Sequence, residues 1–251
     1  MIVCAGLATR DTIFDVPRHP GADDLVIATD RVVAGGGPAA TAAVAIKRLG
    51  GDVRFIGIVD DGLEGVDVVA VPGRVVESVI LVGDGTRSIV TEAPELFTVT
   101  RDLLEGADWL HVDHVGYASL APACFDAGVK ISVDAGIPVP NLDVDAIDLY
   151  APPQERDDGR RAPITVVTRG GLGCTAYIGD ETVEIPAYPV EPVSTLGAGD
   201  VFHGALVACL DRGLELRDAL VRANVCAALS CRALDGRSAI PTWDELEAAV
   251  E

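Results

Sequence analysis

The sequence has few aromatic residues, no long apolar run and no basic segment at its start. Aromatic side chains make up 4% of the 251 residues, while 49% are hydrophobic, so Ala, Val and Leu must build most of the core. That composition favours closely packed α/β layers. No apolar run reaches the length of a membrane span, and no signal peptide is evident. We therefore expect one cytoplasmic domain over residues 1–251.

Closely spaced cysteine pairs are also absent. The six cysteines are scattered, mostly within apolar runs, at Cys4, Cys124, Cys174, Cys209, Cys226 and Cys231. No two of them form a Cys-x-x-Cys pair, so buried reduced thiols are favoured over disulfides or a zinc site.

Positive charge is scarce. There are 39 acidic and 19 basic residues, which gives a net charge of −20. Duplex nucleic acid and anionic membranes would be repelled by most of this surface, so neither is an expected partner. Lys47 and Lys130 are the only lysines, a pattern that either a high-salt source or a GC-rich genome produces. An anionic substrate would have to be held by a local cluster of residues.

Apolar periodicity predicts strands that alternate with helices over most of the chain. Strands are expected at residues 2–7, 53–59, 109–112, 130–133 and 164–168, a hairpin at 174–185, and helices at 39–49, 120–127, from 200, at 216–233 and at 242–250. This alternation predicts an α/β fold, with a doubly wound, mostly parallel sheet and helices on both faces. Two β-rich stretches, within residues 12–33 and 68–91, break the alternation and predict a small second sheet.

The most informative motif is Ser194-Thr195-Leu196-Gly197-Ala198-Gly199-Asp200, which precedes an apolar helical stretch. Small residues at a turn leave backbone N–H groups open, and a helix start adds its positive dipole end, so an anion can bind there. Asp200 places a carboxylate at the same helix start. An anion site beside a base is what phosphoryl transfer to a hydroxyl requires. The alternative is a Gly-rich turn with Asp as an ordinary N-terminal residue.

Two further glycine clusters follow predicted strands, at residues 35–41 and 168–173. Neither matches the P-loop or the dinucleotide fingerprint, and each alone could be a turn or a close packing contact. Three such clusters in one α/β chain point to ligands at the carboxyl ends of the strands.

These motifs resemble the ribokinase-like, or PfkB, family of carbohydrate kinases. Residues 194–200 resemble its C-terminal signature Asp-Thr-x-Gly-Ala-Gly-Asp, and Gly36-Gly37 through Arg48-Leu49-Gly50 resemble its N-terminal one. Segments 35–45, 199–206 and 236–241 are most similar to the ketohexokinase and sulfofructose kinase branch. The resemblance covers nearly the whole chain and implies a ribokinase-like fold with the small sheet as a lid.

The resemblance implies a role for each matching residue. Asp200 is expected to act as the general base, and the amides of Gly197, Ala198 and Gly199 to bind the transferring phosphoryl group. The expected sugar contacts are Asp11, Gly36, Gly37, Thr41 and Arg87, and the expected nucleotide contacts are Thr168, Gly170, Gly173 and Asn224. The alternatives are a turn residue for Asp11 and an exposed hairpin charge for Arg87.

The chain departs from the family pattern at several positions. Ser194 replaces the first Asp of the signature, which weakens a capping and cation-binding role. Residues 60–67 run directly into a strand where most relatives insert a helix. The family's Asn-x-x-Glu element is unrecognisable around residues 151–156, so no metal ligand is assigned and Glu155 is not adopted as a substitute. His114 stands where sulfofructose kinases use arginine, which argues against a sulfonate substrate; the alternative is a buried structural histidine.

The sequence thus predicts ATP-dependent phosphorylation of a hydroxyl on a small sugar or ketose. ATP and Mg²⁺ are the expected cofactors, with a monovalent cation left open. The expected partners are the sugar, ATP and a second copy joined through the lid strands. The alternatives are a kinase of a nucleoside or a 2-keto-3-deoxy sugar acid, or a non-catalytic relative that binds sugar or nucleotide.

Overall fold

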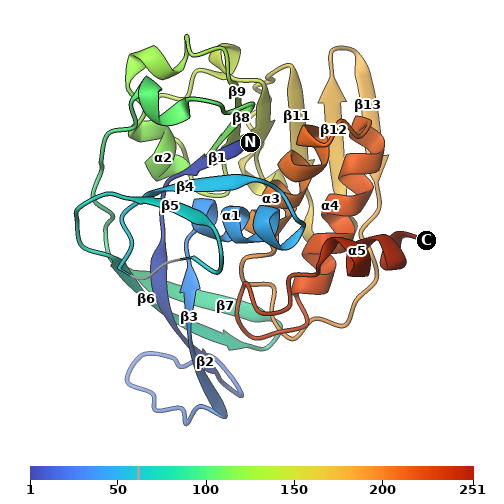
Figure 1. The fold of residues 1–251 in the computed structure, drawn as a ribbon. Coiled ribbons are helices and arrows are strands. Elements are labelled where there is room, and N and C mark those ends of the chain that lie inside the picture. The colour runs from blue at the N-terminus through green and yellow to red at the C-terminus, as the bar shows by residue number, and fades with distance from the viewer. Residues whose placement is uncertain (61–62) are drawn as a thin grey trace.

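A nine-stranded sheet runs through the centre of the molecule, in the order β13-β12-β11-β10-β9-β8-β1-β4-β5 (Figure 1). The computed structural model describes residues 1–60 and 63–251. The strands are β1 (Ile2–Ala5), β4 (Val53–Gly57), β5 (Asp67–Ala70), β8 (Trp109–Val112), β9 (Lys130–Asp134), β10 (Leu149–Ala151), β11 (Ile164–Thr168), β12 (Cys174–Ile178) and β13 (Glu181–Ile185). Neighbours from β5 to β11 are parallel, and the β12–β13 hairpin is antiparallel. The predicted α/β class is confirmed.

The strand order reverses beside β1. From β1 the chain continues to β4 and β5 on one side, and later to β8, β9, β10 and β11 on the other. Loops that leave the carboxyl ends of β1 and β8 therefore diverge, and this is where open α/β sheets bind ligands. Of the expected run over residues 60–67, Asp61 and Gly62 lie outside the described residues.

Long helices cover one face of this sheet (Figure 1). They are α1 (Pro38–Arg48), α3 (Ala198–Asp211), α4 (Leu216–Ser230) and α5 (Trp243–Val250). Pro38 occupies the first turn of α1, where its missing N–H is tolerated. Small side chains let the helices pack closely: a Cβ on Gly204 of α3 would lie 2.5 Å from the Ala42 carbonyl oxygen of α1. Among the described residues, no helix is both long and apolar enough to cross a membrane.

Short helical turns cover the opposite face. They are α2 (His114–Ala118), η1 (Arg101–Leu104), η2 (Pro122–Cys124), η3 (Val144–Ala146) and η4 (Gln154–Arg156). The prediction of one helix over residues 120–127 is wrong. Proline disfavours the helical conformation in the residue before it, and Ala121 accordingly has ψ 146°, so only the turn η2 forms.

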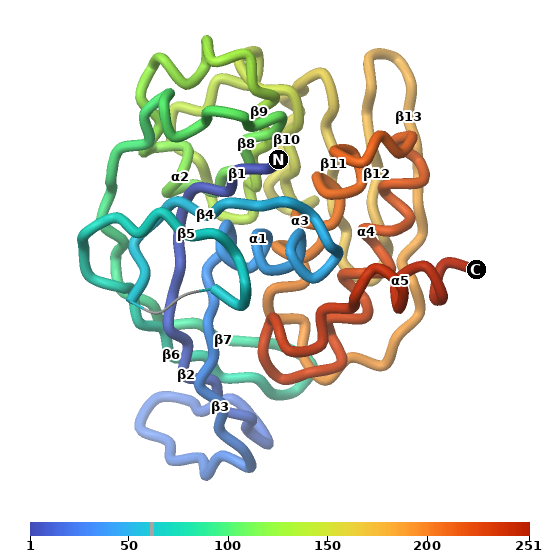
Figure 2. Tube along the Cα trace, in the orientation of Figure 1, coloured from blue at the N-terminus to red at the C-terminus, as the bar shows by residue number. Residues whose placement is uncertain are grey.

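The predicted small sheet is confirmed, with different boundaries. Its order is β3-β2-β6-β7, from β2 (Thr9–Asp15), β3 (Asp30–Gly36), β6 (Val76–Gly83) and β7 (Thr86–Thr91). We call this sheet the lid. Residues 68–71 were expected in it, but residues 68–70 belong to β5 of the large sheet, which is parallel to β4. Residues 17–29 form an irregular loop at the tip of the lid (Figure 2), because Pro17 and Pro20 cannot donate backbone hydrogen bonds.

Candidate active site

The lid turns one face toward the large sheet, and three predicted site residues belong to that face. Ile13 and Ile80 mark it, since both are buried and pack against Leu196. Side chains two residues apart share a face, so Asp11 lies on the same side as Ile13. Thr9 and Val82 also belong to this face, since Thr9 lies two residues from Asp11 and Val82 two residues from Ile80. Gly36 of β3 pairs with Thr9, and Arg87 of β7 pairs with Val82. The register of the lid thus brings Asp11, Gly36 and Arg87 to the inner side.

Asp11 is a buried strand residue and not a turn aspartate. Its side chain is 6% exposed, and its Oδ1 accepts a hydrogen bond from Thr9 Oγ1 at 2.7 Å. A Cβ on Gly36 would collide with Asp11 Oδ2, so glycine is needed opposite this carboxylate. Burial raises the pKa of Asp11, while hydrogen bonds from Thr9 and Ser78 and the charge of Arg237 act in the opposite direction.

Arg237 is a site residue to which the sequence analysis gave no role. Its guanidinium is 6% exposed; Nη2 donates to the Gly36 carbonyl at 2.6 Å and Nε to Thr41 Oγ1 at 3.2 Å. Burial lowers its pKa, but arginine remains protonated in proteins, and the charges of Glu64, Asp11 and Asp200 favour that state. Arg237 is therefore a fixed cation that joins β3 of the lid to α1 and lies in the field of both Asp11 and Asp200.

The segment from Ser194 to Asp200, which we call the anion loop, turns into α3 through Gly197. Gly197 has φ 73° and is the N-cap of the helix. A Cβ there would lie 3.0 Å from Gly236 Cα, so both the conformation and the packing require glycine. A Cβ on Gly199 would meet no described atom within 4 Å, and Gly199 is exposed. Ala198 N donates to the Thr195 carbonyl at 3.3 Å within the loop. The first amides of a helix have no intrahelical acceptor, so this turn can still receive an anion.

Ser194, which replaces the aspartate of the family signature, forms a hydrogen bond within the anion loop but does not cap α3, whose N-cap is Gly197. Its side chain is buried, and Ser194 Oγ accepts a hydrogen bond from Leu196 N at 3.1 Å. The shorter hydroxyl therefore still orders the start of the anion loop.

Asp200 occupies the first turn of α3 and is half-buried. Burial, reinforced by the nearby Asp134 and Asp113 carboxylates, raises its pKa to about 8, while His203 and Arg87 act in the opposite direction. This is an unusual state for an aspartate, and such shifts are concentrated at functional sites.

Asp113, which the sequence analysis did not single out, fixes the carboxyl end of β8. Its Oδ1 accepts hydrogen bonds from Val115 N and Gly116 N, both at 2.9 Å. Its Oδ2 accepts from Leu7 N at 2.8 Å and Ala39 N at 3.1 Å. One carboxylate thus ties the end of β1 to the starts of α1 and α2. An aspartate between a strand and a helix is the sequence signal for this N-cap.

His114, the next residue, begins α2 and is half-buried. Within residues 1–60 and 63–251 its Nδ1 is buried with no hydrogen-bond partner. It is therefore not a fully satisfied core histidine.

Arg87 links the lid to the anion loop. Its Nη1 donates a hydrogen bond to Thr195 Oγ1 at 3.0 Å. Beside this contact lies a cavity of about 220 Å³ between the β6–β7 turn and residues 192–195. Arg87 also lowers the pKa of Asp200, so it contributes positive charge at the predicted phosphoryl path.

The predicted nucleotide residues lie together near the carboxyl end of β11. Thr168 ends β11, and its N donates to the Pro152 carbonyl at 3.0 Å. Cβ atoms on Gly170 and Gly171 would meet no described atom within 4 Å, so η5 (Gly170–Leu172) is open to a ligand. Asn224 of α4 reaches the end of the same loop.

Two contacts close this loop. Gly173 has φ 91°, and a Cβ there would collide with the Ile185 carbonyl of β13. Backbone conformation and packing therefore both require glycine at this position. Asn224 Nδ2 donates to Cys174 Sγ at 3.3 Å. The structure therefore places Asn224 beside the loop, while nucleotide binding by these residues stays a prediction.

No protein ligand for Mg²⁺ is evident in the part of the chain that the structure describes. No three His, Cys, Asp or Glu side chains there are grouped as a metal site, and Glu155 lies exposed in η4. Mg²⁺ in phosphoryl-transfer enzymes is held largely by nucleotide oxygens and water. We therefore assign it no residue.

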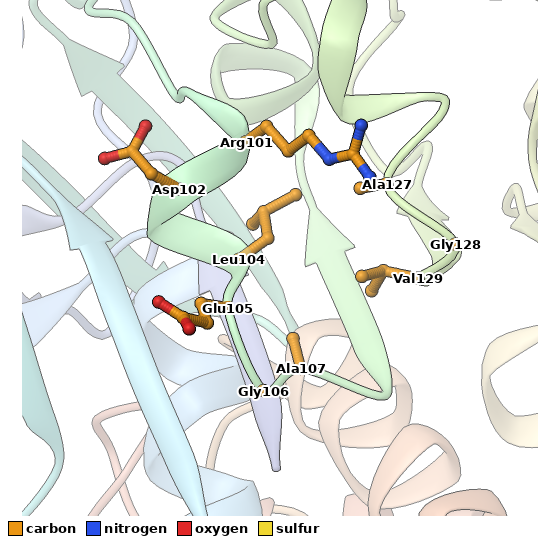
Figure 3. A pocket seen from close by; sticks show the side chains of 9 residues that line it. All are labelled: Arg101, Asp102, Leu104, Glu105, Gly106, Ala107, Ala127, Gly128 and Val129. Atoms are coloured by element: carbon orange, nitrogen blue, oxygen red, sulfur yellow. The ribbon is translucent and has the colours of Figure 1, made fainter.

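A cavity of about 620 Å³ lies at the amino ends of β8 and β9, at the opposite end of these strands from the candidate active site (Figure 3). Residues of η1 and the segments that lead into β8 and β9 line it, including Arg101, Leu104 and Val129. Asp113 and Asp134 stand at the other, carboxyl ends of these strands. This cavity is therefore separate from the candidate active site.

Asp200, with its raised pKa at the start of α3, and the buried Asp11 of the lid fit the predicted phosphoryl transfer to a hydroxyl. Comparison with known families agrees: the profile of the pfkB family carbohydrate kinases matches residues 1–70 and 155–243. The chain belongs to this family, and the predicted family, fold and enzyme class are confirmed.

Relatives of known function match over nearly the whole chain. The ribokinase of Bacillus subtilis (strain 168) is 26% identical, with 98% of each chain covered. The ATP-dependent ribose-1-phosphate kinase of Halopiger xanaduensis is 27% identical, with 98% of this chain and 97% of the relative covered. These relatives are a ribokinase and a ribose-1-phosphate kinase, not members of the ketohexokinase and sulfofructose kinase branch that the motifs resemble.

A solved structure shows the same fold. Arabidopsis thaliana ribokinase in complex with ribose and ATP superimposes with a TM-score of 0.79, at 19% identity, with 100% of this chain and 98% of that chain covered.

Proposed function

We propose that this protein transfers the γ-phosphoryl group of ATP to a hydroxyl of a small neutral sugar, with Asp200 as the general base. The observation that carries the proposal is the place of Asp200 in the first turn of α3, directly after the Gly197 turn. Its raised pKa of about 8 supports the role, because a general base accepts a proton best when its pKa is near the working pH.

The anion loop is proposed to stabilise the phosphoryl group during transfer. The amides of Gly197, Ala198 and Gly199 precede or begin α3, where N–H groups and the helix dipole both favour negative charge. Arg87 adds a cation from the lid side. In this arrangement Asp200 takes the hydroxyl proton while the sugar oxygen attacks the phosphorus in line with the leaving ADP oxygen.

The sugar is proposed to lie against Asp11 and the start of α1. Asp11 can accept hydrogen bonds from sugar hydroxyls. Gly36 must lack a side chain beside Asp11, and Gly37, with φ 90°, must lack one beside the Leu7 carbonyl. Thr41, on the first turns of α1, offers a hydroxyl, which Arg237 holds in place.

The charges around this position favour a neutral sugar. Asp11 and Asp200 approach it, and Asp113 and Asp134 lie behind. Arg237 is already engaged by Gly36, Thr41 and Glu64. A phosphorylated sugar or a sugar acid would be repelled. Among neutral sugars, the similarity to the Bacillus subtilis ribokinase favours a pentose such as D-ribose, with a ketose such as D-fructose as the second candidate.

ATP is proposed to bind over the Thr168–Gly173 loop and the part of α4 that contains Asn224. The open surface at Gly170 and the contact between Asn224 and Cys174 support this placement. The ion Mg²⁺ arrives with the nucleotide.

A coupled ADP-release assay over a panel of acceptors tests the proposal. We expect turnover with D-ribose or D-fructose, and little with ribose 1-phosphate, a nucleoside or a 2-keto-3-deoxy sugar acid. Turnover confined to one of the last three compounds would overturn the substrate class. Nucleotide binding without turnover on any acceptor would favour a non-catalytic relative.

We also propose a homodimer through the outer face of the lid. Val33, Thr12, Val79 and Val90 face one another across all four strands, and the three valines are 50%, 45% and 73% exposed. A second copy would cover this apolar row. Light scattering of the wild type and of Val79→Asp tests it: we expect a dimer that the charge dissociates, whereas a monomeric wild type would exclude it.

All six cysteines, each in the described part of the chain, are buried and unpaired, which supports the proposed cytoplasmic location.

A further inference from the structure

A buried ion pair lies directly behind Asp200. His203 follows Asp200 by three residues on α3, so the two side chains lie one helical turn apart. His203 Nδ1 is 2.9 Å from Asp134 Oδ2, and the two side chains are 4% and 3% exposed. Asp134 stands at the carboxyl end of β9, where its Oδ1 accepts a hydrogen bond from Gly136 N at 2.6 Å. The proposed reaction uses neither member of this pair.

Burying two such groups needs a reason. Ion pairs taken out of water repay their desolvation poorly, and well-packed apolar residues often replace them without loss of stability. Among the described residues neither ring nitrogen of His203 makes a hydrogen bond of regular geometry, so the 2.9 Å contact of Nδ1 with Asp134 is an ion-pair contact and Nε2 has no partner. Stability alone therefore does not account for the pair.

The charges that face His203 favour its protonated form. Burial by itself lowers the pKa of this imidazole, but Asp134 and then Asp200 reverse the effect and raise it above the usual value. His203 in turn holds the pKa of Asp134 at about 2, against the effect of burial. The neighbouring His111 of β8, whose ring centre is 6.2 Å from that of His203, is different. Burial and the His203 charge lower the pKa of His111 to about 4, so it is neutral.

Asp200 faces charges from every element around it. Asp134 from β9 and Asp113 from the end of β8 oppose its ionisation, while His203 from its own helix and Arg87 from β7 favour it. Arg237, after α4, also lies within its field. Without the His203 charge, the uncompensated Asp134 carboxylate would keep the Asp200 proton in place.

We propose that His203, held as an imidazolium by Asp134, is a positioning residue that balances the Asp134 charge and so lets Asp200 lose its proton and act as the base near neutral pH. The inference rests on the proposed sugar kinase function and deepens it. It assigns the buried pair a role in setting the working pH range of the enzyme.

The test is the pH dependence of kcat/KM for the sugar in four proteins: the wild type, His203→Gln, Asp134→Asn and the double variant. The acidic limb is the part of the profile where kcat/KM rises with pH as Asp200 loses its proton. In His203→Gln the unbalanced Asp134 charge should move this limb to higher pH by about 1 pH unit, while the plateau of kcat/KM at alkaline pH is largely kept. In the double variant both charges are gone, so the limb should return toward that of the wild type.

A purely structural role gives a different pattern. It lowers the plateau in every variant, leaves the limb in place and makes the double variant no better than His203→Gln. That pattern would overturn the inference. His111→Gln is the matched control, because it removes a neighbouring buried histidine that is neutral; its limb should not move.

Asp134→Asn keeps the inference testable if His203→Gln does not fold. Removing the Asp134 charge should leave the limb in place or move it to lower pH, because the group that opposes ionisation of Asp200 is lost. An upward movement would contradict the inference.

A readout without turnover separates this inference from the proposed function. Because Asp200 ionises with difficulty in the folded protein, replacing it by Asn should raise the unfolding temperature increasingly with pH, up to the pKa of Asp200. In the His203→Gln background this rise should continue to higher pH. If the unfolding temperatures behave as described but no sugar kinase activity is found, only the proposed function is wrong. If Asp200→Asn abolishes sugar kinase activity but the acidic limb of the kcat/KM profile does not move in His203→Gln, only the inference is wrong.

Discussion

The large sheet and the lid hold their site residues in different ways. Strands β1 and β8 are buried along their whole length, whereas β7 is exposed along all of its residues. Asp113, at the end of β8, is fixed by four backbone amides, while the contact of Arg87 with the anion loop is one hydrogen bond to Thr195. The difference indicates a rigid half and a more adaptable half. In the proposed reaction the rigid half would carry the chemistry and the lid would contact the sugar.

The apolar cores of the two halves differ in the same sense. The buried core of the lid consists of Ile13, Ile80 and Val82, against which Leu196 and Leu234 of the main body pack. The main body instead packs long helices on a continuous sheet. The lid therefore depends on the main body for its stability, and changes in the two halves should have separable effects.

The largest expected effect is on turnover, from the rigid half. Asp200→Asn removes the proposed base and should lower kcat by about 10²–10⁴-fold. Sugar affinity, measured by calorimetry, should stay within a few-fold of the wild type. The control is Asp180→Asn, which changes an exposed aspartate in the β12–β13 turn. Undiminished turnover in Asp200→Asn would show that Asp200 is not the general base.

Core truncations come next and test whether the halves unfold together. Leu206→Ala in α3 empties a fully buried position and should lower the free energy of unfolding by about 2–5 kcal/mol. Ile80→Ala in the lid should loosen the lid first, so KM for the sugar should rise before global stability falls by that amount. Denaturant unfolding and steady-state kinetics measure both. If Leu206→Ala and Ile80→Ala lower the free energy of unfolding equally, the lid and the main body unfold as one cooperative unit.

The pH dependence of stability should isolate Asp200. Its folded pKa of about 8 lies above the unfolded value of about 3.9, so between these pH values the unfolded chain is ionised while the folded protein keeps the proton. Raising the pH through this window should destabilise the wild type relative to Asp200→Asn. Unfolding temperatures from pH 5 to 9 measure the difference, which should level off above the folded pKa. A constant difference would mean that Asp200 ionises normally.

Asp11 tests the lid half at the sugar. Asp11→Asn removes a charged acceptor of sugar hydroxyls and should raise KM by about 10- to 100-fold, with kcat changed much less. Asp30→Asn, at the exposed start of β3, is the matched control and should leave KM unchanged. A fall in kcat with KM unchanged would place Asp11 among the groups that act only in the transition state.

The smallest effect is expected at the contact between the halves. Arg87→Gln should lower kcat/KM by about 2- to 5-fold, because an exposed charge is well screened by water. Arg31→Gln, on the outer face of the lid next to Phe14, is the control and should have no effect. A loss as large as that of Asp200→Asn would show that Arg87 belongs to the rigid chemistry and not to lid closure.

Much of the fold and of the site could be predicted from local patterns. Strands such as β8 and β11 and the helix that begins at the anion loop follow from apolar periodicity, and glycines follow β11 and precede α3. The register of the lid could not be predicted, since β2 pairs in parallel with β6, more than sixty residues later. Residues 68–71 were assigned to the wrong sheet for the same reason: a short apolar strand does not specify its partner.

The sequence by itself determined the glycine turns, the acidic residue at the start of α3 and the family signatures, because each depends on neighbours along the chain. The tertiary structure alone decided what surrounds them. Arg237 reaches Gly36 and Thr41 from about two hundred residues away. Asp134 meets His203 behind Asp200 in the same way. Charge and burial act through space, so the state of the proposed base is fixed by residues that no local pattern connects to it.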